Sequence, residues 1–173
     1  MPAQITLVQE YTDAHLSLDS AHLQRVADTA LQTLTSDDCE LAVVCVDKAQ
    51  SQALNAAHRG KDKPTNVLSF ACDIPSEIVA QLPAVPLGDL IICVPIVLEE
   101  SSAQGKSAQD HFNHLLVHGI LHLLGYDHEL GAEEATIMEQ LEIDILARLG
   151  IKNPYLALDL SLIHISEPTR PLY

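Results

Sequence analysis

The segment HGILHLLGYDH, residues 118–128, constrains the fold of this chain more than any other. His118 and His122 are four residues apart, so their imidazoles lie on one face if the segment is helical. Gly125 can end that helix, because glycine adopts left-handed backbone conformations at little steric cost. The turn that follows would bring His128 back towards the same face. The segment therefore predicts a long helix and a turn that together gather three imidazoles.

Three neutral imidazoles are a typical zinc ligand set, and they leave one position of a tetrahedral ion open. We therefore predict one divalent metal ion, most simply zinc, bound by His118, His122 and His128. The same ligands also accept nickel or copper, so the sequence does not name the metal. Asp127 or Glu129 would close the site if either supplied a fourth ligand.

Other polar residues of this region have two possible roles. His111 and His114 precede the three histidines on a neighbouring helix face, where each is either a surface residue or a residue that supports the ligands. Asp127 either orients a ligand imidazole or caps the turn.

The rest of the sequence alternates between strand and helix patterns. Strands are expected at 5–11, 40–47, 65–73 and 87–94, and helices at 21–34, 48–60, 95–104, 107–125 and 131–150. In the last helix we expect the apolar stripe to contain Ile137, Leu141, Ile145 and Leu149. Segment 75–86 has three prolines and is expected to be a loop. This order favours an α+β fold: a small mixed β-sheet packed with helices, and the metal site on a long helix and its following turn.

The chain is expected to form one domain, residues 1–159, because no repeat or linker divides it. Residues 160–173 lack strand or helix periodicity, and 160–170 resemble a transposase sequencing adapter translated in frame. We therefore predict that residues 160–173 are a non-native tail outside the fold.

Composition limits the cellular context. The chain has no apolar run near the 18 or so residues of a membrane span, and its first residues lack a signal-peptide pattern, so we expect a cytoplasmic protein without membrane contact. The four cysteines form no CxxC pair, and Cys45 and Cys93 lie in apolar runs. Buried free thiols are therefore expected rather than disulfides or metal ligands.

The formal net charge of −15 argues against a general nucleic-acid binder, which needs cations to neutralise phosphates. However, Arg59, Lys61 and Lys63 fall within five residues and form a local basic patch. The acidic remainder suits basic protein partners.

The histidine spacing is also that of the zinc-binding motif of metzincin proteases, with one difference. Gly119 stands where those proteases have a glutamate that acts as general base. Glycine cannot carry a proton, so a zinc peptidase is disfavoured.

Several motifs in order resemble those of one family. HGILHLLGYDH resembles the signature of the YbeY family of bacterial endoribonucleases and rRNA maturation factors. LNAAHRGKDKPTNVLSF and LGDLIIC resemble its second and third motifs, and EEATIMEQLEIDIL resembles its last helix, so the resemblance covers roughly residues 5–150. Two departures are small: His58 stands where an aromatic residue is common, and Asn66 replaces a frequent aspartate.

The resemblance implies a hydrolase: a metal-dependent, single-strand-specific endoribonuclease acting in small-subunit rRNA 3′-end maturation and ribosome quality control. It assigns the metal to His118, His122 and His128 and a functional arginine to Arg59. His118 and Arg59 are then catalytic, and Arg59, Lys61 and Lys63 are expected to bind substrate. The expected partners are an rRNA precursor and the small ribosomal subunit with its basic proteins.

The chemistry of the residues agrees with a nuclease. Phosphodiester cleavage builds up negative charge, which a metal ion and a guanidinium can both stabilise. RNA carries its own 2′-hydroxyl, so the lack of a glutamate base need not prevent cleavage. The sequence leaves open whether water or this hydroxyl is the nucleophile, the preferred RNA sequence and the oligomeric state. The alternative is a metal-stabilised ribosome-assembly factor that does not cut RNA.

Overall fold

The computed structural model describes residues 3–126 and 131–155. Its elements, in chain order, are β1 (Ala3–Gln9), α1 (Ser20–Leu34), β2 (Cys39–Val46), α2 (Lys48–Arg59), β3 (Val67–Ala71), α3 (Ser76–Val79), β4 (Val85–Cys93), α4 (Val94–Gln104), α5 (Ala108–Leu123) and α6 (Ala132–Arg148). The tail predicted at 160–173 lies outside the described residues, so its role stays a prediction.

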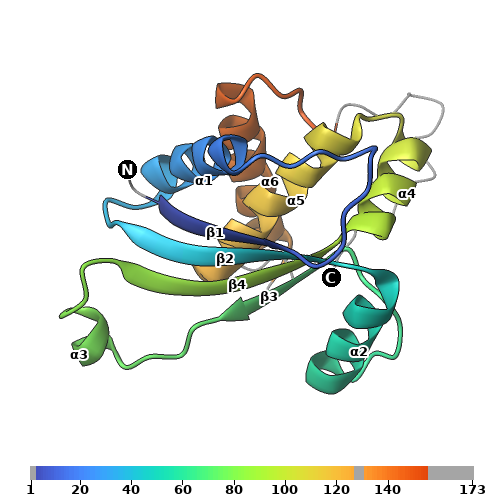
Figure 1. The fold of residues 1–173 in the computed structure, drawn as a ribbon. Coiled ribbons are helices and arrows are strands. Elements are labelled where there is room, and N and C mark those ends of the chain that lie inside the picture. Colours follow the sequence, from blue (N-terminus) through green and yellow to red (C-terminus); the bar gives the residue numbers. More distant parts are fainter. Residues whose placement is uncertain (1–2, 127–130, 156–173) are drawn as a thin grey trace.

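The four strands form one mixed sheet in the order β1-β2-β4-β3 (Figure 1). β1, β2 and β4 are parallel, and β3 runs antiparallel to β4 at one edge. The predicted α+β fold with a small mixed sheet is therefore confirmed.

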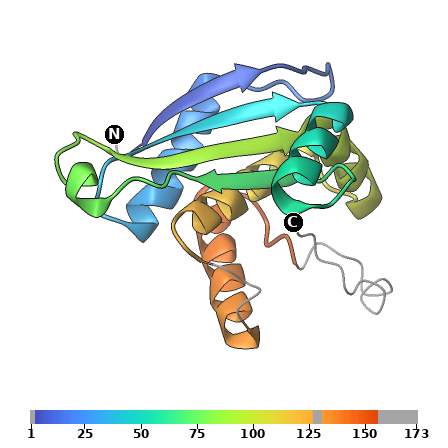
Figure 2. The same cartoon turned by 90° about the horizontal axis from the view of Figure 1, so that it is seen from below.

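Helix α5 lies at the centre of the packing. It contacts α1, α4 and α6 as well as strands β3 and β4. In Figure 1 the helices α1, α5 and α6 cover one face of the sheet, whereas α2 lies on the opposite face near one end, as Figure 2 also shows. Because α5 is enclosed in this way, Phe112, Leu116 and Ile120 are fully buried. The helix that carries the histidines is thus held rigidly by the core.

The ends of the helices follow the local signals in the sequence. Asp47 and Gln50 form a capping box at the start of α2, and Gly60 ends that helix in the left-handed conformation. The Asp19 side chain accepts a hydrogen bond from the backbone N–H of Ala21 at the start of α1. The predicted ends of these helices are confirmed. They could be predicted because they depend on neighbouring residues alone.

The predicted loop at 75–86 is partly wrong. It contains α3, where the Pro75 carbonyl accepts backbone hydrogen bonds from Ile78 and Val79. It also contains the start of β4, where the pairing of β2 with β4 shifts register between Glu40 and Leu41. Pro86 is tolerated there, since an irregularity in the ladder relieves the need for its missing N–H.

The expected apolar stripe of α6 is also partly wrong. Ile137 is 48% exposed, whereas Met138 and Glu142 are buried together with Ile145. The buried face is therefore rotated around the helix relative to the expected one. As a result, a glutamate enters the interior.

The four cysteines are free, as predicted. Cys39, Cys45 and Cys93 are buried, and burial raises the pKa of Cys45 to about 12. Cys72, just after β3, is exposed, so the expectation of burial is wrong for this residue. Within residues 3–126 and 131–155, none of the helices combines the length and the apolar character that a membrane crossing requires.

Candidate metal centre

The C-terminal end of α5 has the geometry that the sequence predicts. The N–H of Gly125 donates to the His122 carbonyl and the N–H of Tyr126 donates to the Leu121 carbonyl, which together make a Schellman motif. Gly125 has φ +100°, a conformation that favours glycine. At the other end of α5, the Ser107 side chain accepts from the N–H of Asp110. The last two turns of the helix, with His118 and His122, therefore lie next to the turn that follows.

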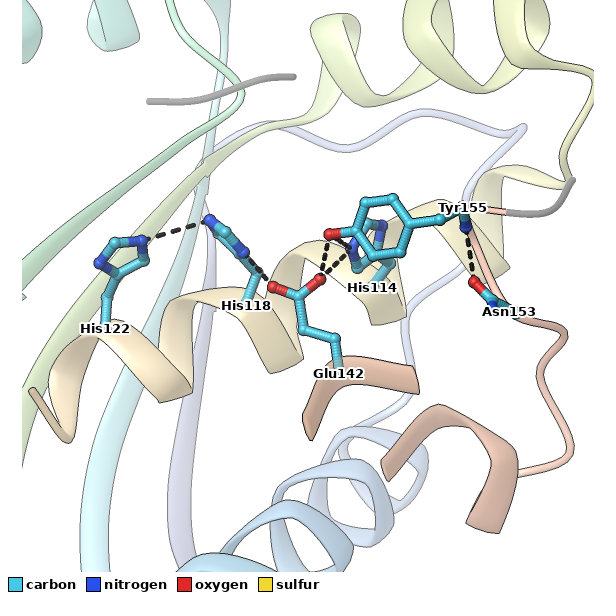
Figure 3. A network of polar contacts seen from close by, with 6 residues as sticks. All are labelled: His114, His118, His122, Glu142, Asn153 and Tyr155. Carbon is cyan, nitrogen blue, oxygen red and sulfur yellow. Dashed lines mark hydrogen bonds and ion pairs between the residues drawn. The ribbon is translucent and has the colours of Figure 1, made fainter. Parts of the chain in front are cut away.

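His118 and His122 point towards each other (Figure 3). Their Nε2 atoms lie 3.3 Å apart. Each residue is partly buried, and the side chain of His118 is 15% exposed. The i, i+4 spacing thus brings two imidazole nitrogens together at the edge of the core, as predicted.

This separation fits a shared metal ion. Two ligand nitrogens about 2.0–2.1 Å from a tetrahedral zinc ion would lie about 3.3–3.4 Å apart. The Nδ1 atom of His118 contacts the Glu142 carboxylate, and when a neutral imidazole donates its N–H there, its Nε2 carries a lone pair towards His122. The residues present therefore suit a divalent metal ion.

The third predicted ligand, His128, lies outside the described residues, as do Asp127 and Glu129. Residues 3–126 and 131–155 contain no cluster of three or more histidine, cysteine or acidic side chains arranged to hold a metal. The three-histidine set and a possible fourth ligand therefore stay predictions.

Glu142 is a residue of this candidate site that the sequence did not predict. Its side chain is completely buried and accepts hydrogen bonds from three groups: His118 Nδ1, His114 Nε2 at 2.7 Å and the Tyr155 hydroxyl at 2.5 Å (Figure 3). Glu142 lies four positions after Met138, on the buried face of α6, and this spacing could have indicated a buried acidic residue. The predicted buried face instead followed the stripe that contains Ile137.

The carboxylate and the imidazoles affect each other's ionisation. Burial by itself would raise the pKa of Glu142, but hydrogen bonds from His114 and His118 outweigh it and hold this pKa well below its usual range. Burial also lowers the pKa of His114, in spite of the opposing influence of Glu142. Glu142 is therefore an ionised carboxylate, and the His114 ring that donates to it is neutral.

The two histidines that precede the pair are not surface residues. His111 is 2% exposed and His114 is 9% exposed. His111 Nε2 contacts Glu100 at 2.8 Å, and Glu100 in turn accepts from Asn66. His114 contacts the ligand candidate His118 through Glu142. The surface interpretation was therefore wrong for both, and a supporting role of His114 for a ligand stays a prediction.

Gly119 has a packing role that the sequence did not reveal. A Cβ atom at this position would lie 2.7 Å from a methyl group of Leu90, which is fully buried on β4. The close approach of α5 to the sheet therefore favours glycine where a metzincin has glutamate, because a Cβ atom would force the Leu90 side chain to shift. A glutamate there would have to enter the packed core, which disfavours a peptidase further.

We expect Gly119→Ala to lower the free energy of unfolding by roughly 1–2 kcal/mol, since overpacking exceeds alanine's better helix propensity. Urea unfolding of the zinc-free protein measures this. In a Leu90→Ala background, where the clashing methyl groups are gone, the same substitution should cost nothing. A Gly119→Ala protein as stable as the wild type would refute the packing role.

The predicted basic residues lie at another part of the surface. Arg59 and Lys61 line a surface pocket together with His58 and the β3 residues Ser69, Phe70 and Ala71. His58 makes an edge-on ring contact with Phe70, with centroids 4.9 Å apart. Lys63 is exposed but is not part of this lining. The structure thus brings together two of the three predicted substrate-binding residues, beside β3.

Comparisons with known proteins point to one family. A family model described as "Endoribonuclease YbeY" matches residues 6–150. Proteins named "Endoribonuclease YbeY" from Acinetobacter baumannii and Acinetobacter baylyi are 53% and 52% identical over 156 residues, covering 90% of this chain and 99% and 98% of theirs. A third, from Alteromonas mediterranea, is 48% identical over 135 residues, covering 78% of this chain and 82% of its own.

Among solved structures, the solution structure of a Thermotoga maritima protein matches with a TM-score of 0.53 at 22% identity. The match covers 85% of this chain and 92% of the other, and it supports the fold. The family model spans the strands, the basic pocket and the paired histidines, and the relatives extend over nearly the whole of both chains. The chain therefore belongs to the YbeY family.

Proposed function

We propose that this protein is a metal-dependent endoribonuclease that cleaves single-stranded RNA. The observation that carries the proposal is the 3.3 Å approach of the His118 and His122 Nε2 atoms, in a chain whose close relatives are named endoribonucleases. We propose zinc as the metal and His128 as its third ligand. When bound, such an ion acts as a Lewis acid that stabilises negative charge developing on a phosphoryl group.

The side chains of the protein have separate roles in this proposal. His118 and His122 supply two ligand nitrogens whose Nε2 atoms lie 3.3 Å apart, on a helix that packs against the sheet and three other helices. Arg59 binds a phosphate of the RNA, for which its planar guanidinium offers two parallel N–H donors. Lys61 and Lys63 add positive charge beside it, and Lys61 does so within the same pocket.

The preference for single strands rests on the position of β3. This strand forms an edge of the sheet, packs against α5 and lines the Arg59 pocket. The basic pocket and the histidine helix are thus connected through one edge strand. A flexible single strand can bend around such an edge and contact both, whereas a stiff A-form duplex presents its phosphates in a fixed geometry.

We further propose a cytoplasmic role in small-subunit rRNA 3′-end maturation and ribosome quality control. The net charge of −15 disfavours indiscriminate RNA binding and suits contact with basic ribosomal proteins. In that setting the small subunit would supply most of the binding energy, and the basic patch of Arg59, Lys61 and Lys63 would direct the RNA locally.

The test uses the untagged full chain, loaded with zinc or stripped by a chelator, on matched single-stranded and duplex RNA and on casein. We expect cleavage of single-stranded RNA alone, lost on chelation and restored by zinc. If zinc-loaded protein cuts no RNA, either alone or with small ribosomal subunits, it is a ribosome-assembly factor without catalysis. Cleavage of casein would instead support a peptidase.

A further inference from the structure

Three hydrogen-bond donors converge on one buried carboxylate next to the histidine pair. His114 Nε2 and the Tyr155 hydroxyl contact Oε1 of Glu142, while His118 Nδ1 contacts Oε2. We call Glu142, His114 and Tyr155 the Glu142 clamp. Its members come from α6, α5 and the segment after α6, so tertiary packing alone brings them together (Figure 3).

The clamp determines which nitrogen of His118 carries the proton. A carboxylate that accepts at Oε2 requires the N–H of His118 to be at Nδ1. In the neutral imidazole the other nitrogen, Nε2, then carries the lone pair, and it faces the Nε2 atom of His122 at 3.3 Å. A histidine can bind a metal through Nε2 only in this tautomer.

The other two members keep the carboxylate in place. Glu142 is 0% exposed, so an unpaired carboxylate there would be strongly destabilising. His114 and Tyr155 occupy Oε1, which leaves Oε2 for His118. His114 uses Nε2 for this contact, and its Nδ1 has no hydrogen-bond partner within the described part of the chain. Its Nε2 contacts, with the carboxylate at 2.7 Å and with the Tyr155 hydroxyl at 3.5 Å, are thus the polar interactions that account for this buried ring.

We propose that Glu142 is a positioning residue that fixes the tautomer and ring orientation of His118 for metal binding, and that Tyr155 and His114 hold Glu142 in that position. The proposal rests on the proposed function, because it takes His118 to be a metal ligand. Tyr155 lies beyond residue 150, where the family match ends, so the segment after α6 completes a centre that the matched region does not contain in full.

A purely structural role is the competing explanation, because Glu142 also joins α6 to α5. A structural link would affect the stability of the zinc-free fold and leave the intrinsic affinity for metal unchanged. A positioning residue changes the metal affinity and the imidazole tautomer. The experiment therefore measures both of these quantities as well as stability.

The first measurement needs no substitution. Long-range proton–nitrogen correlation NMR of metal-free wild-type protein reports which nitrogen of each neutral imidazole is protonated. We expect His118 to carry its proton at Nδ1. In Glu142→Gln, a single side-chain oxygen replaces two and an amide donor enters the site, so the Nε2–H form of His118 should increase. A wild-type His118 protonated mainly at Nε2 would overturn the proposal.

The second measurement is the affinity for zinc alone, by competition with a chelator. Glu142→Gln should weaken binding by about 10–100-fold, the usual effect of removing such an outer partner. Tyr155→Phe, which removes only the hydroxyl, should weaken it less, near or below the lower end of that range. Matched controls are Glu133→Gln, an exposed carboxylate on the same helix, and Tyr11→Phe, another partly buried tyrosine, and both should bind zinc like the wild type.

The outcomes separate this proposal from the proposed function. Wild-type zinc affinity in folded Glu142→Gln would overturn the clamp, whatever the RNA assay shows. If Glu142→Gln does not fold, Tyr155→Phe and the wild-type tautomer decide the question, and either an unchanged zinc affinity of Tyr155→Phe or an Nε2–H tautomer of His118 overturns the clamp. If the clamp variants weaken zinc binding but the wild type cuts no RNA, the nuclease proposal fails and the clamp stands.

Discussion

Replacing His118 by alanine is expected to abolish zinc binding and RNA cleavage together. The substitution removes one of the two Nε2 atoms that lie 3.3 Å apart. The two proposed ligands that remain, His122 and His128, cannot hold zinc tightly at the usual tetrahedral site. Elemental analysis of untagged protein should fall from one equivalent of zinc per chain to well below one. Cleavage of single-stranded RNA should fall to the level of a blank.

A comparison with His122→Ala makes this test sharper. Both variants lose a proposed ligand, but only His118→Ala also removes a hydrogen bond to the buried Glu142 carboxylate. In zinc-free protein, His118→Ala should therefore be less stable than His122→Ala by about 1.5–3 kcal/mol, the contribution of a hydrogen bond to a charged group. His15→Ala is the control, because the His15 side chain is 85% exposed. Full zinc content in folded His118→Ala would exclude His118 as a ligand.

Replacing Arg59 by alanine should separate catalysis from metal binding. Arg59 is exposed at the end of α2 and lines the pocket beside β3, so its loss should leave the fold and the zinc content intact. Cleavage should still drop by about 10²–10³-fold, because removing one charge-stabilising donor from an active site costs about 2.7–4 kcal/mol. The measurement is the initial rate of RNA cleavage at saturating zinc. Arg59→Lys should recover part of the loss, since an ammonium group keeps the charge but not the two-pronged contact.

Arg148→Ala is a close control for Arg59→Ala. Arg148 is also exposed and also lies in the last turn of its helix, where a cation interacts favourably with the helix dipole. It should therefore reproduce any small effect on stability without an effect on cleavage. If Arg59→Ala cuts RNA as fast as Arg148→Ala does, Arg59 is an ordinary surface cation and the phosphate contact is wrong.

Features that depend on neighbouring residues could be predicted from the sequence. The long helix begins after Ser107 and ends before Gly125. The four-residue spacing of His118 and His122 puts both imidazoles on one face. The strands of the mixed sheet and its helices could be predicted from apolar runs and capping residues. Each of these depends on interactions between residues a few positions apart, whose geometry is the same in most proteins.

Features that join distant segments could not be predicted in this way. The insertion of β4 between β2 and β3 depends on which apolar faces pack together, and no local pattern states it. The partner of His118 is Glu142, 24 positions later on another helix. Its burial depends on the rotation of α6 about its own axis, which the packing of Met138 and Ile145 determines.

Gly119 has one property that the sequence determines and another that only the tertiary structure reveals. The sequence alone established that no side chain at this position can act as a base, and therefore that peptidase chemistry is disfavoured. Only the tertiary structure revealed that Leu90 leaves no space for a Cβ atom, because the approach of α5 to β4 is a property of the assembled core. Local chemistry thus determined the identity of the metal ligands that we propose, whereas packing between distant segments decided what holds them in place.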